Sequence, residues 1–215
     1  HMMTMPFKAA GETIYLLHAE EWATAGPERS HLGKSLWLSE IHGRDEGRTP
    51  PTDLTVEKNA GRIVRQLIAD APGDPYFQEL KGEILFKSGR IEEALQPLGR
   101  AVRTLPNAPL LRIGLAHAQI ELNRPDLLAA AVGNLEMALR VKKTMPIAWR
   151  LAATAYGRQN RLGRSALASA EYNFLVGRLK DAKRMAGRAQ GILKRGSPGW
   201  LRAGDVINAV DRRKR

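Results

Sequence analysis

The chain has no cysteine among its 215 residues. This absence excludes disulfide bonds, thiolate metal ligands and a cysteine nucleophile, and it leaves the cellular compartment open. The sequence also has no run of eighteen or more apolar residues, and its first residues lack the basic, apolar, small-residue order of a signal peptide. We therefore expect neither a membrane span nor an export signal.

Recognisable catalytic motifs are missing as well. There is no G-x-S-x-G, no P-loop and no G-x-G-x-x-G. The stretch HAEEW is not a zinc-protease H-E-x-x-H motif, because Ala19 follows His18 and Trp22 stands where the second histidine is needed. His31 and His42 lie in turn-rich sequence without ligand-like spacing, so we expect them at the surface. The sequence predicts no catalytic residue, no metal and no cofactor.

Aromatic residues make up only 6% of the chain, whereas basic residues are abundant. Lys and Arg number 34 against 22 Asp and Glu, which gives a net charge of +12. Such a charge attracts nucleic acid, anionic lipid or an acidic protein. The few aromatics fall mostly at core-like positions and do not form the stacking platform of a single-strand binder. A basic nucleic-acid-binding repeat protein therefore stays an alternative and not the main expectation.

A repeated dipeptide indicates the architecture. Gly89, Asn123, Asn160 and Gly177 are each followed by arginine and are separated by 34, 37 and 17 residues. A period of 34 is that of the tetratricopeptide repeat (TPR), a helix-turn-helix unit. Gly or Asn after a first helix provides the left-handed residue that reverses the chain. We predict an all-α fold, a TPR-like α-α superhelix that forms a right-handed solenoid of antiparallel helix pairs.

The segment 75–108 has the TPR pattern of small and large residues and ends with proline. Its pattern positions are Gly82, Leu85, Ala94, Leu98, Ala101 and Pro106. Small residues let two helices approach closely, and large ones fill the space between them. Asp74 is the expected N-cap of the first helix, with Pro75 at its first position. Pro97 is expected to bend the second helix.

The later repeats depart from the ideal period. The second repeat gains three residues around RPDLLAAAV, which we place in or next to its turn. The interval of 17 is half a repeat. The helix at about 162–176 is therefore expected to serve both as the second helix of repeat three and as the first of repeat four, completed by 179–194. A last helix should begin at Ser197-Pro198 and cap the array.

These patterns divide the chain into three parts. Residues 52–210 form the TPR-like domain, residues 1–51 an N-terminal arm and linker without repeat register, and residues 211–215 a basic tail. The domain is expected to start with the second helix of an incomplete repeat, whose pattern positions are Ala60, Val64, Leu67 and Pro72.

Stacked first helices of a TPR array line a concave surface that suits a peptide or a protein segment. The side chains expected to face this groove are Tyr76, Glu79, Glu83, Lys87, Ile113, His117, Glu121, Arg150, Thr154 and Arg158. The groove would be acidic at one end and basic at the other, and the alternative is that these are ordinary solvated side chains. His117 is either a groove residue or a partly buried histidine.

A second candidate surface is a basic helix face. It consists of Lys180, Arg184, Arg188 and Arg195. Such a face is either simply solvated or a docking site for an acidic partner.

Four stretches carry a family resemblance: DPYFQELKGEILFKSGR, AWRLAATAYGRQN, LASAEYNFLVGR and GSPGWLRAGDVI. In this order, over about residues 60–208, they resemble the C-terminal TPR region of BepA-type bacterial zinc metallopeptidases. The resemblance implies a noncatalytic scaffold that recruits a protein segment, with a protease domain or its substrate as the partner, and a periplasmic location. No H-E-x-x-H motif is present, so no catalytic residue carries over. The alternative is a fragment of a zinc metalloprotease that is active only with its missing catalytic domain.

Overall fold

The computed structural model describes residues 62, 65–66 and 69–213. Chain contacts divide the protein into two units, His1–Ala69 and Asp70–Arg215. The second unit is all-helical, and its described residues contain no strand. The predictions for the arm 1–51, for the start of the domain at residue 52 and for residues 214–215 of the tail 211–215 concern residues outside the described part, whereas residues 211–213 belong to the last helix. The same is true of His18, His31, His42, Ala60, Val64 and Leu67.

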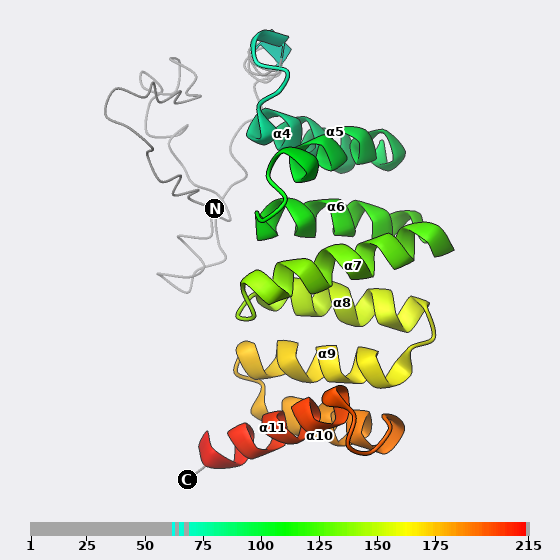
Figure 1. Cartoon of the computed structure of the whole chain (residues 1–215), viewed down its shortest axis with the longest axis vertical. Helices are drawn as coiled ribbons and strands as arrows, with labels where there is room; N and C mark the ends of the chain where they lie inside the picture. Colours follow the sequence, from blue (N-terminus) through cyan, green and yellow to red (C-terminus); the bar gives the residue numbers. More distant parts are fainter. Residues whose placement is uncertain (1–61, 63–64, 67–68, 214–215) are drawn as a thin grey trace, which may run out of the picture. The chain divides into compact units, whose positions relative to one another are not determined.

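From Pro75 to Arg213, eight helices follow one another (Figure 1). They are α4 (Pro75–Lys87), α5 (Ile91–Thr104), α6 (Pro109–Leu122), α7 (Pro125–Val141), α8 (Pro146–Arg158), α9 (Leu162–Leu175), α10 (Leu179–Ile192) and α11 (Pro198–Arg213). Each packs against the next, as a helical repeat requires. The predicted all-α, TPR-like α-α superhelix is therefore confirmed.

Every predicted turn residue has a left-handed backbone. The φ angle is 77° at Gly89, 52° at Asn123, 57° at Asn160 and 78° at Gly177. Glycine reaches this region without a Cβ clash, and asparagine tolerates it better than most other residues. The four residues follow the ends of α4, α6, α8 and α9, which confirms the predicted positions of the turns.

At three of the four turns, after Gly89, Asn160 and Gly177, the backbone amide of the following arginine closes the turn. The amide of Arg90 donates to the carbonyl of Leu85 at 2.9 Å, and the amide of Arg161 donates to that of Tyr156 at 2.8 Å. A bond to the carbonyl five residues earlier is typical of the Schellman motif. The hydrogen bond comes from the backbone amide and not from the arginine side chain, so any residue except proline could make it.

The start of α4 is also as expected, because the carboxylate of Asp74 accepts from the amides of Tyr76 and Phe77 at 2.8 and 3.1 Å. A Cβ added at Gly82 would lie 2.4 Å from Cγ of Leu98, so only glycine permits this helix spacing. Ala94 and Ala101 are fully buried. The small-residue pattern of the first repeat thus sets the distance between α4 and α5.

α9 has the predicted double role. It packs against α8 on one side and α10 on the other, and it also contacts α11. Among the earlier helices, α4 contacts α6 and α6 contacts α8. Contacts between helices two positions apart thus join even-numbered helices up to α8, and the next such contact joins α9 and α11. The three extra residues of repeat two lengthen the start of α7, which has 17 residues where α5 has 14.

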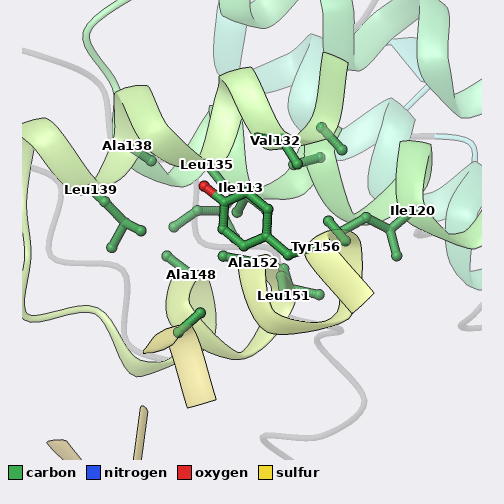
Figure 2. Close-up of a cluster of buried hydrophobic side chains, with 14 of the residues drawn as sticks. Ile113, Ile120, Val132, Leu135, Ala138, Leu139, Ala148, Leu151, Ala152 and Tyr156 are labelled. Carbon is green, nitrogen blue, oxygen red and sulfur yellow. The ribbon is translucent and has the colours of Figure 1, made fainter. Parts of the chain in front are cut away.

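The largest buried cluster lies between α6, α7 and α8 (Figure 2). Leu135 and Ala138 of α7, Ile120 of α6 and Ala148 of α8 are all fully buried in this cluster. Tyr156 joins this cluster with 8% of its surface exposed. Two further clusters lie between α5 and α6 and between α9, α10 and α11. The cores join neighbouring helices, as expected for a stacked array.

Candidate functional site

The predicted groove follows α4, α6 and α8, which contact one another in succession. Most of its candidate residues are accessible: Tyr76, Glu83, Lys87, Glu121, Arg150, Thr154 and Arg158 are exposed, and Glu79 and His117 are half-buried. On α4, Lys87 pairs with Glu83 at 2.8 Å. Burial raises the pKa of Glu79, and the charge of Glu83 raises it further. As a binding surface the groove stays a prediction.

His117 lies at the centre of this groove. Its ring is 4.7 Å from the ring of Phe86 of α4, and its Nε2 is 3.8 Å from a carboxylate oxygen of Glu121. Burial lowers the pKa of His117; Glu121 opposes this shift, and Arg150 of α8 adds to it. The structure thus brings residues of all three helices together around the imidazole.

Two predicted groove residues have structural roles instead. Ile113 is 6% exposed and packs in the cluster of Figure 2, so its expected place on the groove surface is wrong. The α6 helix turns Ile113 towards α7 and α8, where apolar area is covered. Arg158 donates a hydrogen bond from its guanidinium to the carbonyl of Ile120 in the last turn of α6, which also accepts from the amide of Asn123 at 3.0 Å.

The predicted basic face is exposed in full. Lys180, Arg184 and Arg188 lie on α10, opposite the buried Ala182 and Ala189. Arg195 lies beyond the end of α10, so it continues the charge but not the helix face. Arg184 pairs with Asp181 at 2.8 Å. A docking role for this face stays a prediction.

A hollow that the sequence did not predict lies elsewhere, around α9. It is a pocket of about 650 Å³, within the range of 300–1,000 Å³ that ligand sites occupy. Its apolar wall includes Leu139 of α7, Trp149 and Ala152 of α8, Leu167 of α9 and Leu193 after α10. We call it the α9 pocket. None of the predicted groove or basic-face residues lines it.

Leu193 is held in this wall by two glycines. A Cβ at Gly163 of α9 would lie 2.7 Å from Cδ2 of Leu193, and one at Gly199 of α11 would lie 3.2 Å from its Cδ1. The leucine thus fills the space that two missing side chains leave between α9 and α11. Ser197 caps the start of α11, since its hydroxyl accepts a hydrogen bond from the amide of Trp200 at 3.3 Å.

Cationic side chains border the pocket. Five of them belong to its lining and are exposed: Arg140, Lys143, Arg164, Lys194 and Arg202. Glu136 is the one carboxylate of the lining. Its oxygen Oε1 accepts from the hydroxyl of Tyr156 at 2.7 Å and lies 3.4 Å from Arg164. Burial and Glu136 together raise the pKa of Tyr156 to about 12, so this phenol stays protonated and donating at neutral pH.

Sequence reasoning missed this pocket. Its lining comes from α7 and α8, before α9, and from the segment at Leu193 and α11, after it. The one sequence signal was the interval of 17 residues between Asn160 and Gly177, which marks the helix with the double role. In the described part of the chain, no three His, Asp or Glu side chains gather as a metal site requires, and no helix is long and apolar enough to cross a bilayer.

Sequence comparison finds relatives that are not the BepA-type metallopeptidases of the resemblance. No family model matches the chain. The phosphoribosylformylglycinamidine synthase subunit PurL of Erythrobacter litoralis is 71% identical over 69 residues, 32% of this chain and 9% of that protein. PurL of Novosphingobium aromaticivorans is 46% identical over 68 residues, 32% of this chain and 8% of that protein. The chain thus spans less than a tenth of these curated relatives.

These relatives correct two expectations. The resemblance to a BepA-type metallopeptidase is wrong, because the curated relatives are PurL subunits. The implied protease partner, protease fragment and periplasmic location lose their basis with it. The expectation that the chain is not an enzyme is also contradicted, since these relatives are subunits of an enzyme.

The similar solved structures concern the fold. A crystal structure of MamA has a TM-score of 0.53 and 15% identity, covering 76% of this chain and 96% of its own. MamA 41-end from Desulfovibrio magneticus RS-1 has a TM-score of 0.53 and 14% identity, covering 88% and 96%. At such identities the likeness extends to the fold alone. Together with the left-handed turns and the alternating helix contacts, it makes residues 70–213 a TPR-like helical-repeat unit.

Proposed function

We propose that residues 70–213 are a scaffold that binds a segment of another protein, with an apolar side chain of that segment inserted in the α9 pocket. The observation that carries the proposal is the pocket of about 650 Å³, whose wall is apolar and whose border is charged. Apolar hollows with a few placed polar groups are typical binding sites. Stacked helical repeats present extended surfaces that fit protein segments.

Peptide selection tests this function. A display library of random peptides is selected on the full chain and counter-selected on Leu167→Gln, which keeps nearly the volume of leucine but places an amide in the apolar wall. Leu110→Gln is the matched control, because Leu110 is 59% exposed on α6 and does not line the pocket. We expect peptides that bind the native chain and the control and bind Leu167→Gln at least about tenfold more weakly.

A fluorescence measurement locates the bound peptide. Trp149 lines the pocket, so a chain with Trp22, Trp37 and Trp200 replaced by phenylalanine reports on this site alone. An inserted apolar side chain displaces water from the indole and should shift its emission to shorter wavelength in a saturable way. The proposal would be rejected if no selected peptide binds Leu167→Gln more weakly than Leu110→Gln and no selected peptide shifts the emission of Trp149.

The groove along α4, α6 and α8 is a second surface for the same function. His117 joins residues from all three helices there, which supports a shared surface. A variant with alanine at Glu83, His117 and Arg150 tests it with the same peptides. Loss of binding in this variant, with Leu167→Gln unaffected, would assign the segment to the groove and not to the pocket.

The likeness to PurL favours a second candidate function. A stretch of 69 residues that is 71% identical keeps most of the side chains of the corresponding part of PurL. This supports a role connected with phosphoribosylformylglycinamidine synthase. In this role, the matching stretch of the chain would bind the same partners as the corresponding part of PurL and compete with PurL for them. The synthase activity of the Erythrobacter litoralis subunit is measured with and without excess chain, and the chain alone is assayed in parallel. Unchanged synthase activity with no signal from the chain alone would reject this candidate.

A further inference from the structure

We propose that the α9 pocket selects protein segments in which acidic side chains flank the inserted apolar one. The inference rests on the proposed function, because it names the chemistry of the segment that the pocket binds. It starts from the charges around the opening: five cationic side chains and a single carboxylate belong to the lining.

Two of these five cations are already neutralised within the chain. Arg164 lies 3.4 Å from the carboxylate of Glu136. Arg202 makes a two-point ion pair with Glu171, a residue of α9 that is 3% exposed. These pairs join elements of the pocket to one another, so they are part of its wall and do not require an external anion.

The other three cations have no such partner in the part of the chain that the structure describes. Among residues 69–213, no carboxylate lies within ion-pair distance of Arg140, Lys143 or Lys194. Within the same residues, the guanidinium of Arg140 has only the sulfur of Met137 as a hydrogen-bond acceptor, at 3.7 Å. Arg140 lies in the last turn of α7 and Lys143 shortly after it, whereas Lys194 follows α10. Unpaired positive charge therefore reaches the pocket from both sides of α9.

This arrangement distinguishes among apolar segments by their charge. A segment with lysines beside its apolar residue meets like charges at Arg140, Lys143 and Lys194, while glutamates or aspartates at the same positions gain three ion pairs. Exposed ion pairs are individually weak, so discrimination arises from several of them together. Selection by charge is thus expected to be moderate and sensitive to salt.

The apolar surface continues beyond the pocket, which favours a chain segment over a small amphiphilic anion. Met137 and Val141 are 36% and 57% exposed on α7 and lie one turn apart, beside the pocket-facing Arg140. Leu201 is 54% exposed on α11, directly before Arg202. A fatty acid inside the pocket would leave these side chains uncovered, whereas a polypeptide that crosses the opening covers them.

The composition of the selected peptides is the first test. Peptides that discriminate against Leu167→Gln should be enriched in glutamate and aspartate next to their apolar residues, relative to the starting library. Pocket-dependent peptides without this enrichment would overturn the inference and leave the proposed function standing. A selection with no pocket-dependent peptide would instead remove the proposed function, so the two failures are distinguishable.

A charge series on one selected peptide is the second test. Its acidic residues are replaced by glutamine or by lysine, and binding to the full chain is measured by fluorescence anisotropy at low and high salt. We expect the lysine version to bind at least about tenfold more weakly than the acidic one, with a smaller ratio at high salt. Equal binding of the three versions would contradict the inference.

The net charge of +12 calls for a matched control, because it attracts any acidic peptide. Lys143→Glu with Lys194→Glu reverses two pocket charges, and Lys180→Glu with Arg188→Glu makes the same net change on α10, away from the pocket lining. The first variant should prefer the lysine peptide, and the second should keep the preference for the acidic one. The opposite result would place acidic recognition on the α10 face and overturn the inference.

Dodecanoate serves as the small-molecule probe. We expect it to leave the emission of Trp149 unchanged at concentrations where the selected peptide saturates the shift. If dodecanoate shifts the emission at lower concentration than the peptide and displaces it, the pocket takes a fatty acid, and the inference of an acidic protein segment is wrong.

Discussion

Glu171 of α9 and Arg202 of α11 form an ion pair in which the carboxylate side chain is 4% exposed and the guanidinium side chain 45% exposed. Both carboxylate oxygens accept from the guanidinium, and the bond from Nη2 to Oε2 measures 3.2 Å. The pair fastens α11 to α9 beside the α9 pocket, to whose lining Arg202 belongs. A buried carboxylate with a single cationic partner makes the position of α11 sensitive to either residue.

Arg202→Ala should lower the free energy of unfolding by about 2 kcal/mol, because it leaves the carboxylate of Glu171 buried and unpaired. Adding Glu171→Gln should recover part of this loss, since the amide has no charge to bury. Urea unfolding followed by circular dichroism measures both. A double variant less stable than Arg202→Ala would show that the unpaired charge is not the cause.

Gly82→Ala should destabilise the repeats by about 1–3 kcal/mol, since its Cβ would overlap the side chain of Leu98. Gly133→Ala is the matched control in the interior of α7, where nothing lies within 4 Å of the added Cβ. There alanine should stabilise by about 0.5–1 kcal/mol through helix propensity alone. Thermal unfolding of the two variants should therefore move in opposite directions, and a shift in the same direction would argue against the helix spacing described.

His117 should make the stability of the fold depend on pH below neutrality. Its pKa is lowered in the folded chain, chiefly by burial, so the unfolded chain binds the proton more readily. The contribution of the neutral imidazole is therefore complete above the unfolded pKa of about 6.5 and is lost as the pH falls below it. Urea midpoints between pH 5 and 8 should show this slope, and His117→Gln should flatten it.

An NMR titration of the His117 ring gives the independent check. Its pKa should lie below that of a histidine in a denatured chain, and Arg150→Gln should bring it upward, because Arg150 lowers it. A ring that titrates at or above its usual value would contradict the partial burial of His117 against Phe86 of α4.

Tyr156 should titrate late, at about pH 12, because burial and the carboxylate of Glu136 disfavour the phenolate. The protonated phenol is favoured in the folded chain, so its contribution to stability is present below about pH 10 and is lost as the pH rises towards 12. Absorbance titration should show a late component at about pH 12 that disappears in Tyr156→Phe. That variant should also lose about 1 kcal/mol with its hydrogen bond to Glu136.

Tyr76→Phe is the control for this measurement, because Tyr76 is 39% exposed and its hydroxyl makes no hydrogen bond in the described part of the chain. It should leave both the late titration and the stability unchanged. Equal effects of the two substitutions would point to a general response of the phenols and not to the bond with Glu136.

The helical units, their turns and their small-residue contacts could be predicted from the sequence because each depends on local chemistry. Left-handed φ angles select Gly or Asn, as at Gly89 and Asn123. Close helix pairs select Gly and Ala, as at Gly82 and Ala94. The half-repeat interval even predicted the double role of α9, because a shortened period leaves one helix to serve two neighbours.

The candidate site could not be predicted from the sequence, because it depends on contacts between helices that are distant along the chain. Ile113 fits the spacing of a groove residue, but burial against α7 and α8 gives it a place in the core. The α9 pocket needs α7, α8 and α11 to meet around α9, and Leu193 to lie between Gly163 and Gly199. By itself, the sequence determined a stack of helices with defined turns. Only the tertiary structure decided which charges and apolar surfaces meet, because contacts between distant residues depend on how each helix is rotated against its neighbours.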